Sequence, residues 1–265
     1  MRLVPARAVH AEWTKLRTLP GTGWLLLATA ALTVTVGAVA ANAVSCPVTG
    51  CLAGHVDPAR VGLTGVDLGQ AIVAILAVTA VSGEYGTGMI RVTLAATPRR
   101  WRVLAAKAAV VSAATLAAGA VAVLASVLLG GLLLARHGIA PAHGYGALTL
   151  GRGPVLRAAA GSVLYLGLIA LLSVGAAAAV RDSAVAIGVV LALLYVLPIV
   201  AGAAGSQSWH RHVDQISPMT AGLYIQATTN LRELPLAPWM GLGVLAAWAA
   251  GAMMAGGLLL SFRDA

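Results

Sequence analysis

The chain has 265 residues, of which 60% are hydrophobic and only 9% are Asp, Glu, Lys or Arg. Soluble globular domains carry about 25% of these charged residues, so the composition excludes a water-soluble fold and predicts a polytopic α-helical membrane protein. The net charge of +9 does not indicate nucleic-acid binding, because the basic residues lie beside long apolar runs, where they set membrane orientation. We therefore expect membrane lipid, and no nucleic acid, among the partners.

Residues 1–20 are predicted to form a short helix that lies in the membrane interface. Apolar residues recur there at intervals of three or four, and the charged residues lie mostly off that stripe. The dipeptide Pro20-Gly21 breaks this helix before the chain enters the bilayer. The residues expected to hold the helix at the interface are Trp13, Lys15, Leu16 and Arg17.

Six apolar segments follow, each long enough to cross a hydrocarbon core of about 30 Å at 1.5 Å per residue. The predicted spans are 24–44, 63–83, 104–135, 155–180, 184–204 and 239–260. Asp67 and Gln70 are expected in the outer turns of the second span, near the interface. The outer segment 205–238 is predicted to hold a short helix over 218–229. The expected fold is a single all-α transmembrane domain over residues 1–265, with six transmembrane helices, an N-terminal interfacial helix and short outer helices before the last span.

An even number of spans places both termini on one side of the membrane. The segments on that side are 1–23, 84–107, 181–183 and 261–265, and they hold eleven of the 17 Lys and Arg residues. Positive residues are enriched in cytoplasmic loops. We therefore expect a multi-pass protein of the cell membrane, with both termini and the loop 84–104 in the cytoplasm.

The two cysteines, Cys46 and Cys51, fall in the first outer loop, on the oxidising side of the membrane. Their spacing permits a small disulfide loop, and the sequence leaves open whether it forms. Only His55 lies near them, and the pair His210 and His212 has no third ligand nearby. We therefore expect no metal site.

The sequence contains no G-x-x-x-x-G-K-[ST] segment, so the chain is not expected to bind ATP phosphates itself. No Asp, Glu, Lys or Arg falls at the predicted middle of a span. This argues against an ion-coupled carrier, although backbone carbonyls of broken helices could replace such groups, and against an intramembrane hydrolase. We expect no enzyme activity and no cofactor on this chain, so the energy for any transport must come from outside it.

The segment 82–107, SGEYGTGMIRVTLAATPRRWRVLAAK, resembles the first cytoplasmic loop of ABC transporter permeases of the type-2 exporter class, especially the actinobacterial ones. The segments AEWTKLRTLPGTGWLLL and LTGVDLGQAIVAILAV are similar to the same group, and the six-span layout extends the resemblance over essentially the whole chain. The resemblance implies that two permease chains pair, as a homodimer or with a second permease. It also implies that each docks a separate ATP-binding subunit, which holds ATP and Mg.

In that family the loop after the second span forms a coupling helix that inserts into the ATP-binding subunit. The resemblance implies that the helix near residues 9–19 lies against the same subunit, and that residues 217–230 close the outer exit. Two glycines that permit a turn, an apolar set and one arginine are also typical of a partner-binding hot spot. The candidate coupling residues are Glu84, Tyr85, Gly86, Thr87, Met89, Ile90, Arg91 and Thr93.

Residues 99–107 are interpreted instead as a membrane anchor at the foot of the third span, formed mainly by Arg99, Arg100 and Arg102. An alternative is that the whole loop is only a positive-inside anchor. Glu84 is expected to pair with an arginine of the loop or of the partner.

The function expected from these observations is that of a permease subunit of an ATP-driven exporter. Its substrate would be hydrophobic or amphipathic, such as a lipid-like compound, a drug or an antibiotic. The alternatives are a membrane scaffold or sensor anchor and, less favoured, an ion-coupled carrier.

Overall fold

The structure, a computed structural model, describes residues 3–44, 56–86, 88–89, 100–137, 139, 148–203 and 207–262. Within these ranges every regular element is helical, and six helical segments are long and apolar enough to cross a membrane. The predicted all-α fold with six transmembrane helices is therefore confirmed, and the chain is a multi-pass membrane protein. The predicted site residues that lie outside the described ranges are Cys46, Cys51, Thr87, Ile90, Arg91, Thr93 and Arg99.

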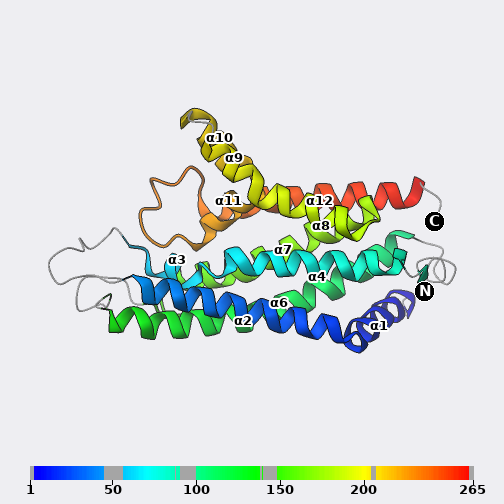
Figure 1. The fold of residues 1–265 in the computed structure, drawn as a ribbon, viewed down its shortest axis with the longest axis horizontal. Coiled ribbons are helices and arrows are strands. Elements are labelled where there is room, and N and C mark those ends of the chain that lie inside the picture. Colours follow the sequence, from blue (N-terminus) through cyan, green and yellow to red (C-terminus); the bar gives the residue numbers. More distant parts are fainter. Residues whose placement is uncertain are drawn as a thin grey trace.

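The long helices lie side by side along one axis, and both chain termini lie at the same end of the bundle (Figure 1). We call this the termini end, and we call the opposite end, which carries α3 and α11, the far end. The elements are α1 (Leu3–Thr18), α2 (Pro20–Ala43), α3 (Pro58–Leu63), α4 (Val66–Gly86), α6 (Arg100–Arg136), α7 (Gly153–Val180), α8 (Ser183–Leu191), η2 (Ala192–Val196), α9 (Leu197–Ala203), α10 (Gln207–Ile216), α11 (Pro218–Leu223), η3 (Tyr224–Gln226) and α12 (Pro238–Phe262).

The second span begins earlier than predicted, because Asp57 starts a helix. Its carboxylate accepts hydrogen bonds from the backbone N–H of Ala59 and Arg60, and Pro58 occupies the first helical turn. The same carboxylate also accepts from Thr228 Oγ1 at 2.6 Å and from the N–H of Thr229 at 3.1 Å. Asp57 therefore joins the start of the second span to the segment that follows η3, at the far end of the bundle.

A short turn divides this span into α3 and α4. A Cβ added at Gly65 would lie 1.8 Å from the carbonyl oxygen of Thr33 in α2, so only glycine permits this close approach of the two helices.

The fifth span departs from a regular α-helix. α8, η2 and α9 follow one another without interruption, and η2 is a π-helical turn in which the N–H of Leu197 donates to the carbonyl oxygen of Ala192. Pro198, which has no N–H to donate, follows this turn. The sequence analysis predicted the length of this span but not its π turn.

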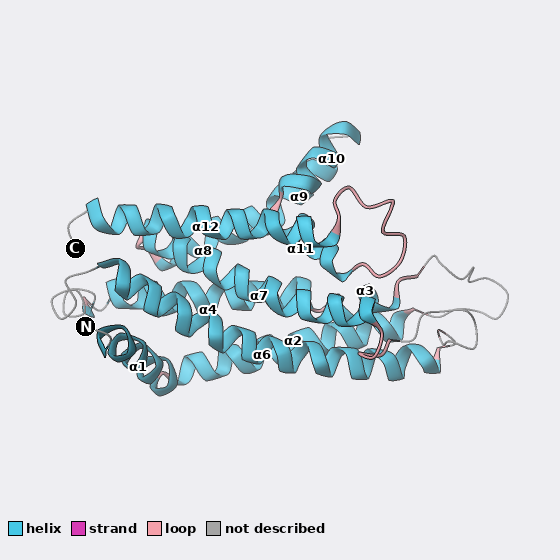
Figure 2. Cartoon of the chain, turned by 180° about the vertical axis from the view of Figure 1, so that it is seen from behind, coloured by secondary structure: helices cyan, strands magenta, loops and turns pink. Residues whose placement is uncertain are grey.

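The outer segment holds more helix than predicted. The predicted helix over 218–229 begins at Pro218 but ends as α11 at Leu223, followed by the short 3₁₀ turn η3. α10, which precedes it, was not predicted, because its polar sequence resembles that of a loop. In the view from behind, α9 and α10 extend away from the bundle (Figure 2).

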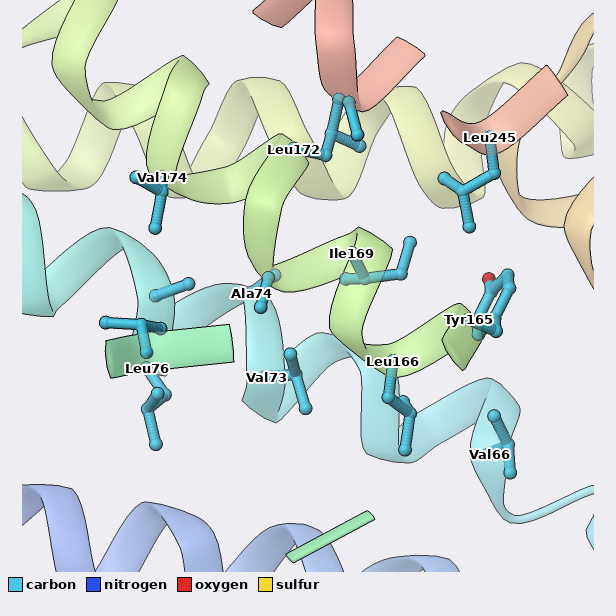
Figure 3. Close-up of a cluster of buried hydrophobic side chains, with 14 of the residues drawn as sticks. Val66, Val73, Ala74, Leu76, Tyr165, Leu166, Ile169, Leu172, Val174 and Leu245 are labelled. Atoms are coloured by element: carbon cyan, nitrogen blue, oxygen red, sulfur yellow. The ribbon is translucent and has the colours of Figure 1, made fainter. Parts of the chain in front are cut away.

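The core is centred on α7. Figure 3 shows Leu166 and Ile169 of α7 between residues of α4, such as Val73, and Leu245 of α12. Glycines bring α7 and α12 together, because a Cβ on Gly175 would lie 2.4 Å from the backbone of α12. Such small residues allow close helix packing in a membrane.

Candidate functional site: an ion-pair network at the termini end

Four charged side chains meet where α1 packs against the first turns of α6, beside the last turn of α4. α1 contributes Glu12 and Lys15, which are three residues apart and therefore lie on one helical face. α4 contributes Glu84, and α6 contributes Lys107. Residues 95 positions apart in the sequence thus form one cluster.

The geometry connects each lysine to both glutamates. Lys107 Nζ lies 2.6 Å from Glu12 Oε2 and 3.0 Å from Glu84 Oε1, and it donates to the carbonyl oxygen of Ala80 at 3.1 Å. Lys15 Nζ lies 2.8 Å from Glu12 Oε1 and 2.8 Å from Glu84 Oε1. The four ion pairs link two lysines and two glutamates, whose formal charges cancel.

Because three of the four side chains are buried, breaking their ion pairs is costly in free energy. Glu12, Glu84 and Lys107 are 6%, 7% and 5% exposed, whereas the side chain of Lys15 is 31% exposed. Removing one partner from a buried ion pair leaves an uncompensated charge and costs about 3–5 kcal/mol. α1, α4 and α6 are therefore expected to move as one unit at this end.

Lys15 stays charged at neutral pH. Its burial alone would lower its pKa, but hydrogen bonds and charge interactions with Glu12 and Glu84 outweigh burial and raise the pKa above 10.5. Lys15 therefore keeps its charge in the network over the physiological pH range.

α1 presents two different faces. Glu12, Lys15 and the partly buried Leu16 face the bundle, while Trp13 is 47% exposed and Arg17 is exposed. The exposed apolar stripe is what a helix at a membrane interface requires, and the charged face holds it to the protein. The sequence analysis placed the charged residues off the apolar stripe, but it did not predict that Glu12 is buried and Lys15 partly buried.

The structure bears on two further expectations. Glu84 is held by Lys15 and Lys107. Its expected pairing with an arginine of the loop or of a partner stays a prediction, because Arg91 and Arg99 lie outside the described ranges. Lys107 was assigned to the membrane anchor, but it is buried in the network, where its Nζ atom pairs with Glu12 and Glu84. Of the anchor arginines, Arg100 donates to the carbonyl oxygen of Leu260 at 2.8 Å, and the guanidinium of Arg102 lies 5.6 Å from the ring centre of Trp101.

The described residues of the predicted coupling loop begin directly beside the network. Tyr85 is partly buried, and the guanidinium of Arg181 lies 5.6 Å from the centre of its ring. α4 ends at the exposed Gly86, and Gly88 has a φ of 70°, a left-handed conformation that favours glycine. Met89 is exposed. These positions show where the loop leaves the bundle, but they do not test its role.

A cavity of about 460 Å³ opens between α1, α4 and α6, with the network at one side. Its other walls are mostly apolar, formed by residues such as Leu16, Leu19, Val110 and Val111. Gly83 also lines it, and a Cβ at Gly83 would meet no atom within 4 Å.

Within the described ranges, no group of three or more His, Cys, Asp or Glu residues is placed to hold a metal ion. The expectation of no metal site stays a prediction, because Cys46, Cys51 and His55 lie outside those ranges.

No known protein-family model matches the chain, and no curated protein matches it either. The ion-pair network therefore has to be interpreted from its own geometry. Glu12 was the residue that the sequence analysis missed, and its only signal was a lone acidic residue among the basic residues of the first 20 positions.

Proposed function

We propose that the chain is the membrane-spanning permease subunit of an ATP-driven exporter, whose ATP and Mg are bound by a separate ATP-binding subunit. The observation that carries this proposal is the buried network that joins α1 to the ends of α4 and α6. These two helix ends flank residues 87–99, which include most of the predicted coupling loop.

A transporter driven by a separate subunit needs a rigid connection between the docking surface and the spans. Displacing α1 would separate both lysines from at least one buried carboxylate, at a cost of several kcal/mol. A force applied to α1 or to the loop would therefore be transmitted to two spans together. This is the mechanical property that a coupling element requires, and a simple membrane anchor does not need it.

Two features of the sequence support the same proposal. The 265 residues contain no phosphate-binding loop, so ATP would have to be hydrolysed on another chain. The loop and the segments before it also resemble those of type-2 ABC permeases. By that resemblance the assembly would hold two permease chains, as a homodimer or with a second permease, and two ATP-binding subunits.

The proposed location is the cell membrane, with the termini end in the cytoplasm. Exposed apolar side chains on α2, α8 and α12, such as Leu27, Val189 and Met254, would be covered by lipid or by a second permease chain. A hydrophobic or amphipathic substrate suits the apolar spans, which consist mainly of Ala, Val, Leu and Gly. Drugs and antibiotics are candidate members of this substrate class.

Purification from the native membrane tests the proposal. The tagged chain is extracted in mild detergent, and the co-purifying proteins are identified by mass spectrometry. We expect an ATP-binding subunit in equal amount, together with Mg-dependent ATP hydrolysis in the eluate. A chain that elutes without any ATP-binding protein would favour a scaffold or a sensor anchor instead.

A further inference from the structure

The cavity between α1, α4 and α6 has the size of a small-molecule site. Its volume of about 460 Å³ falls within the range of about 300–1,000 Å³ for sites that hold drug-sized molecules. At roughly 30 Å³ for each water-sized atom, it has room for roughly 15 non-hydrogen atoms. A molecule with one alkyl chain fits this volume, whereas a phospholipid with two chains is too large for it.

The cavity is open at the termini end of the bundle. Several of the residues that line it are exposed, namely Thr18, Leu19, Thr79, Gly83 and Met89. Thr18 and Leu19 lie where α1 ends and α2 begins, and Met89 follows the end of α4. A ligand can therefore enter between α1 and the last turns of α4.

Most of the wall is apolar and comes from several helices. α1 contributes Leu16, α6 contributes Val110 and Val111, and Leu19 lies at the junction of α1 and α2. Met89 adds a flexible thioether side chain near the opening. An alkyl chain that enters the cavity would exchange water for contact with these side chains, which is favourable in proportion to the apolar area that is covered.

The polar side of the cavity carries no net charge. Glu12, Lys15, Glu84 and Lys107 all line the cavity, and the charges of the two lysines and two glutamates cancel. A charged ligand would place one further, uncompensated charge beside this network, which is costly in partly buried surroundings. The network therefore favours a ligand whose polar group is uncharged.

Two threonines supply hydrogen-bond acceptors for such a group. Thr18 Oγ1 donates to the carbonyl oxygen of Thr14 at 3.0 Å, and Thr79 Oγ1 donates to that of Ile75 at 2.8 Å. Each hydroxyl thus uses its one hydrogen within its own helix, and its oxygen keeps the capacity to accept. The ammonium of Lys15, the most exposed of the four charged side chains, attracts an acceptor oxygen. A hydroxyl group on the ligand satisfies both requirements.

We propose that this cavity binds an uncharged amphiphile with a single alkyl chain and a hydroxyl group. The hydroxyl would lie on the side of Lys15, and the chain would lie against Leu16, Val110 and Val111. A molecule bound there contacts α1, α4 and α6 together, so it adds apolar contacts to the ion pairs that already join them. The proposal concerns binding alone and does not rest on the proposed transport function.

Photolabelling of the purified chain in lipid nanodiscs tests the proposal. The probe is a dodecanol analogue with a diazirine in the middle of its chain, which loses N₂ on irradiation and inserts into neighbouring bonds. Labelled peptides are then identified by mass spectrometry. We expect saturable labelling of the peptides that contain Leu16 and those that contain Val110 and Val111. Labelling spread evenly over the exposed apolar residues of α2, α8 and α12 would show general contact with lipid and would overturn the proposal.

Gly83→Leu should block the cavity without a clash. Gly83 lines the cavity, and a Cβ there would meet no atom within 4 Å, so the leucine carbons would take the space of the alkyl chain. We expect labelling of these peptides to fall about tenfold or more. Gly188→Leu is the matched control, because Gly188 is also an exposed helical glycine with no atom within 4 Å of a Cβ. Labelling should stay within about twofold there, and equal labelling of the two variants would contradict the assignment.

Competition in the wild type gives a second test that needs no variant. Unlabelled dodecanol, dodecanesulfonate and dodecylamine have the same alkyl chain and differ in the charge of the polar group at neutral pH. At equal low mole fractions in the bilayer, dodecanol should reduce labelling at least about fivefold more effectively than either charged compound. Equal or stronger competition by the sulfonate or the amine would show that the cavity does not select an uncharged ligand.

Discussion

Replacing Lys107 with Met should detach α1 from the bundle. Lys107 is 5% exposed, and its Nζ atom lies 2.6 Å from Glu12 Oε2 and 3.0 Å from Glu84 Oε1. Met fills a similar volume but carries no charge, so Glu12 and Glu84 would both lose the buried ammonium of Lys107. Breaking a buried ion pair by removing one partner costs about 3–5 kcal/mol, and here one substitution breaks two pairs. We therefore expect a loss at the upper end of that range.

Reversible unfolding in mixed micelles of increasing SDS content measures this loss. The matched control is Arg136→Met, which removes an exposed cation from the other end of the same helix and should change the free energy of unfolding by less than about 0.5 kcal/mol. The double variant Glu84→Gln/Lys107→Met should recover part of the loss, because it removes one of the two carboxylates that lost the Lys107 ammonium. If Lys107→Met proves no more destabilising than Arg136→Met, the network does not hold α1 in place.

Three further outcomes are expected. Gly175→Ala should destabilise the bundle by about 1–3 kcal/mol in the same SDS assay, because its Cβ would lie 2.4 Å from the α12 backbone. The control Gly188→Ala, whose Cβ would meet no atom within 4 Å, should be neutral or stabilising, and equal effects of the two variants would contradict the packing of α7 on α12. Asp57→Ala should cost about 1–3 kcal/mol and raise proteolytic cleavage near Thr228 and Thr229, and unchanged cleavage would show that Asp57 does not fix that segment. The folded-state pKa of Lys15 is raised above 10.5, so the stabilisation from Lys15 is complete below pH 10.5 and is lost as the pH rises through the folded-state pKa. Protease access to α1 should therefore increase only above about pH 10.5, and an increase near neutral pH would refute the role of Lys15.

The six spans could be predicted from the sequence because each is a continuous apolar run, and membrane thickness fixes the length that such a run needs. The exact ends were less predictable. The start of the second span depends on Asp57, whose side chain caps α3 and also contacts Thr228, a contact between residues 171 positions apart. A local pattern contains no information on such a distant partner.

The ion-pair network could not be predicted from local sequence patterns either. Glu12 and Lys15 at a spacing of three indicate one helical face, but hydropathy places charged residues in water by default. Only the fold brings Lys107 to them and buries Glu12 and Lys107. The π turn at residues 192–196 was missed because its sequence, ALLYV, is an ordinary apolar helix sequence. α10 was missed for the opposite reason, since its polar residues indicate a loop.

The most direct test of the central claim compares ATP hydrolysis by the purified assembly with and without an intact coupling loop. The double variant Ile90→Asp/Arg91→Glu changes two residues predicted to contact the ATP-binding subunit, and the control variant Arg100→Gln/Arg102→Gln changes two of the predicted membrane anchors. Both are reconstituted in nanodiscs with the co-purifying ATP-binding subunit. The account predicts that the loop variant loses the subunit or its stimulated ATP hydrolysis, while the control retains both. ATP hydrolysis and association that are unchanged in the loop variant would contradict it.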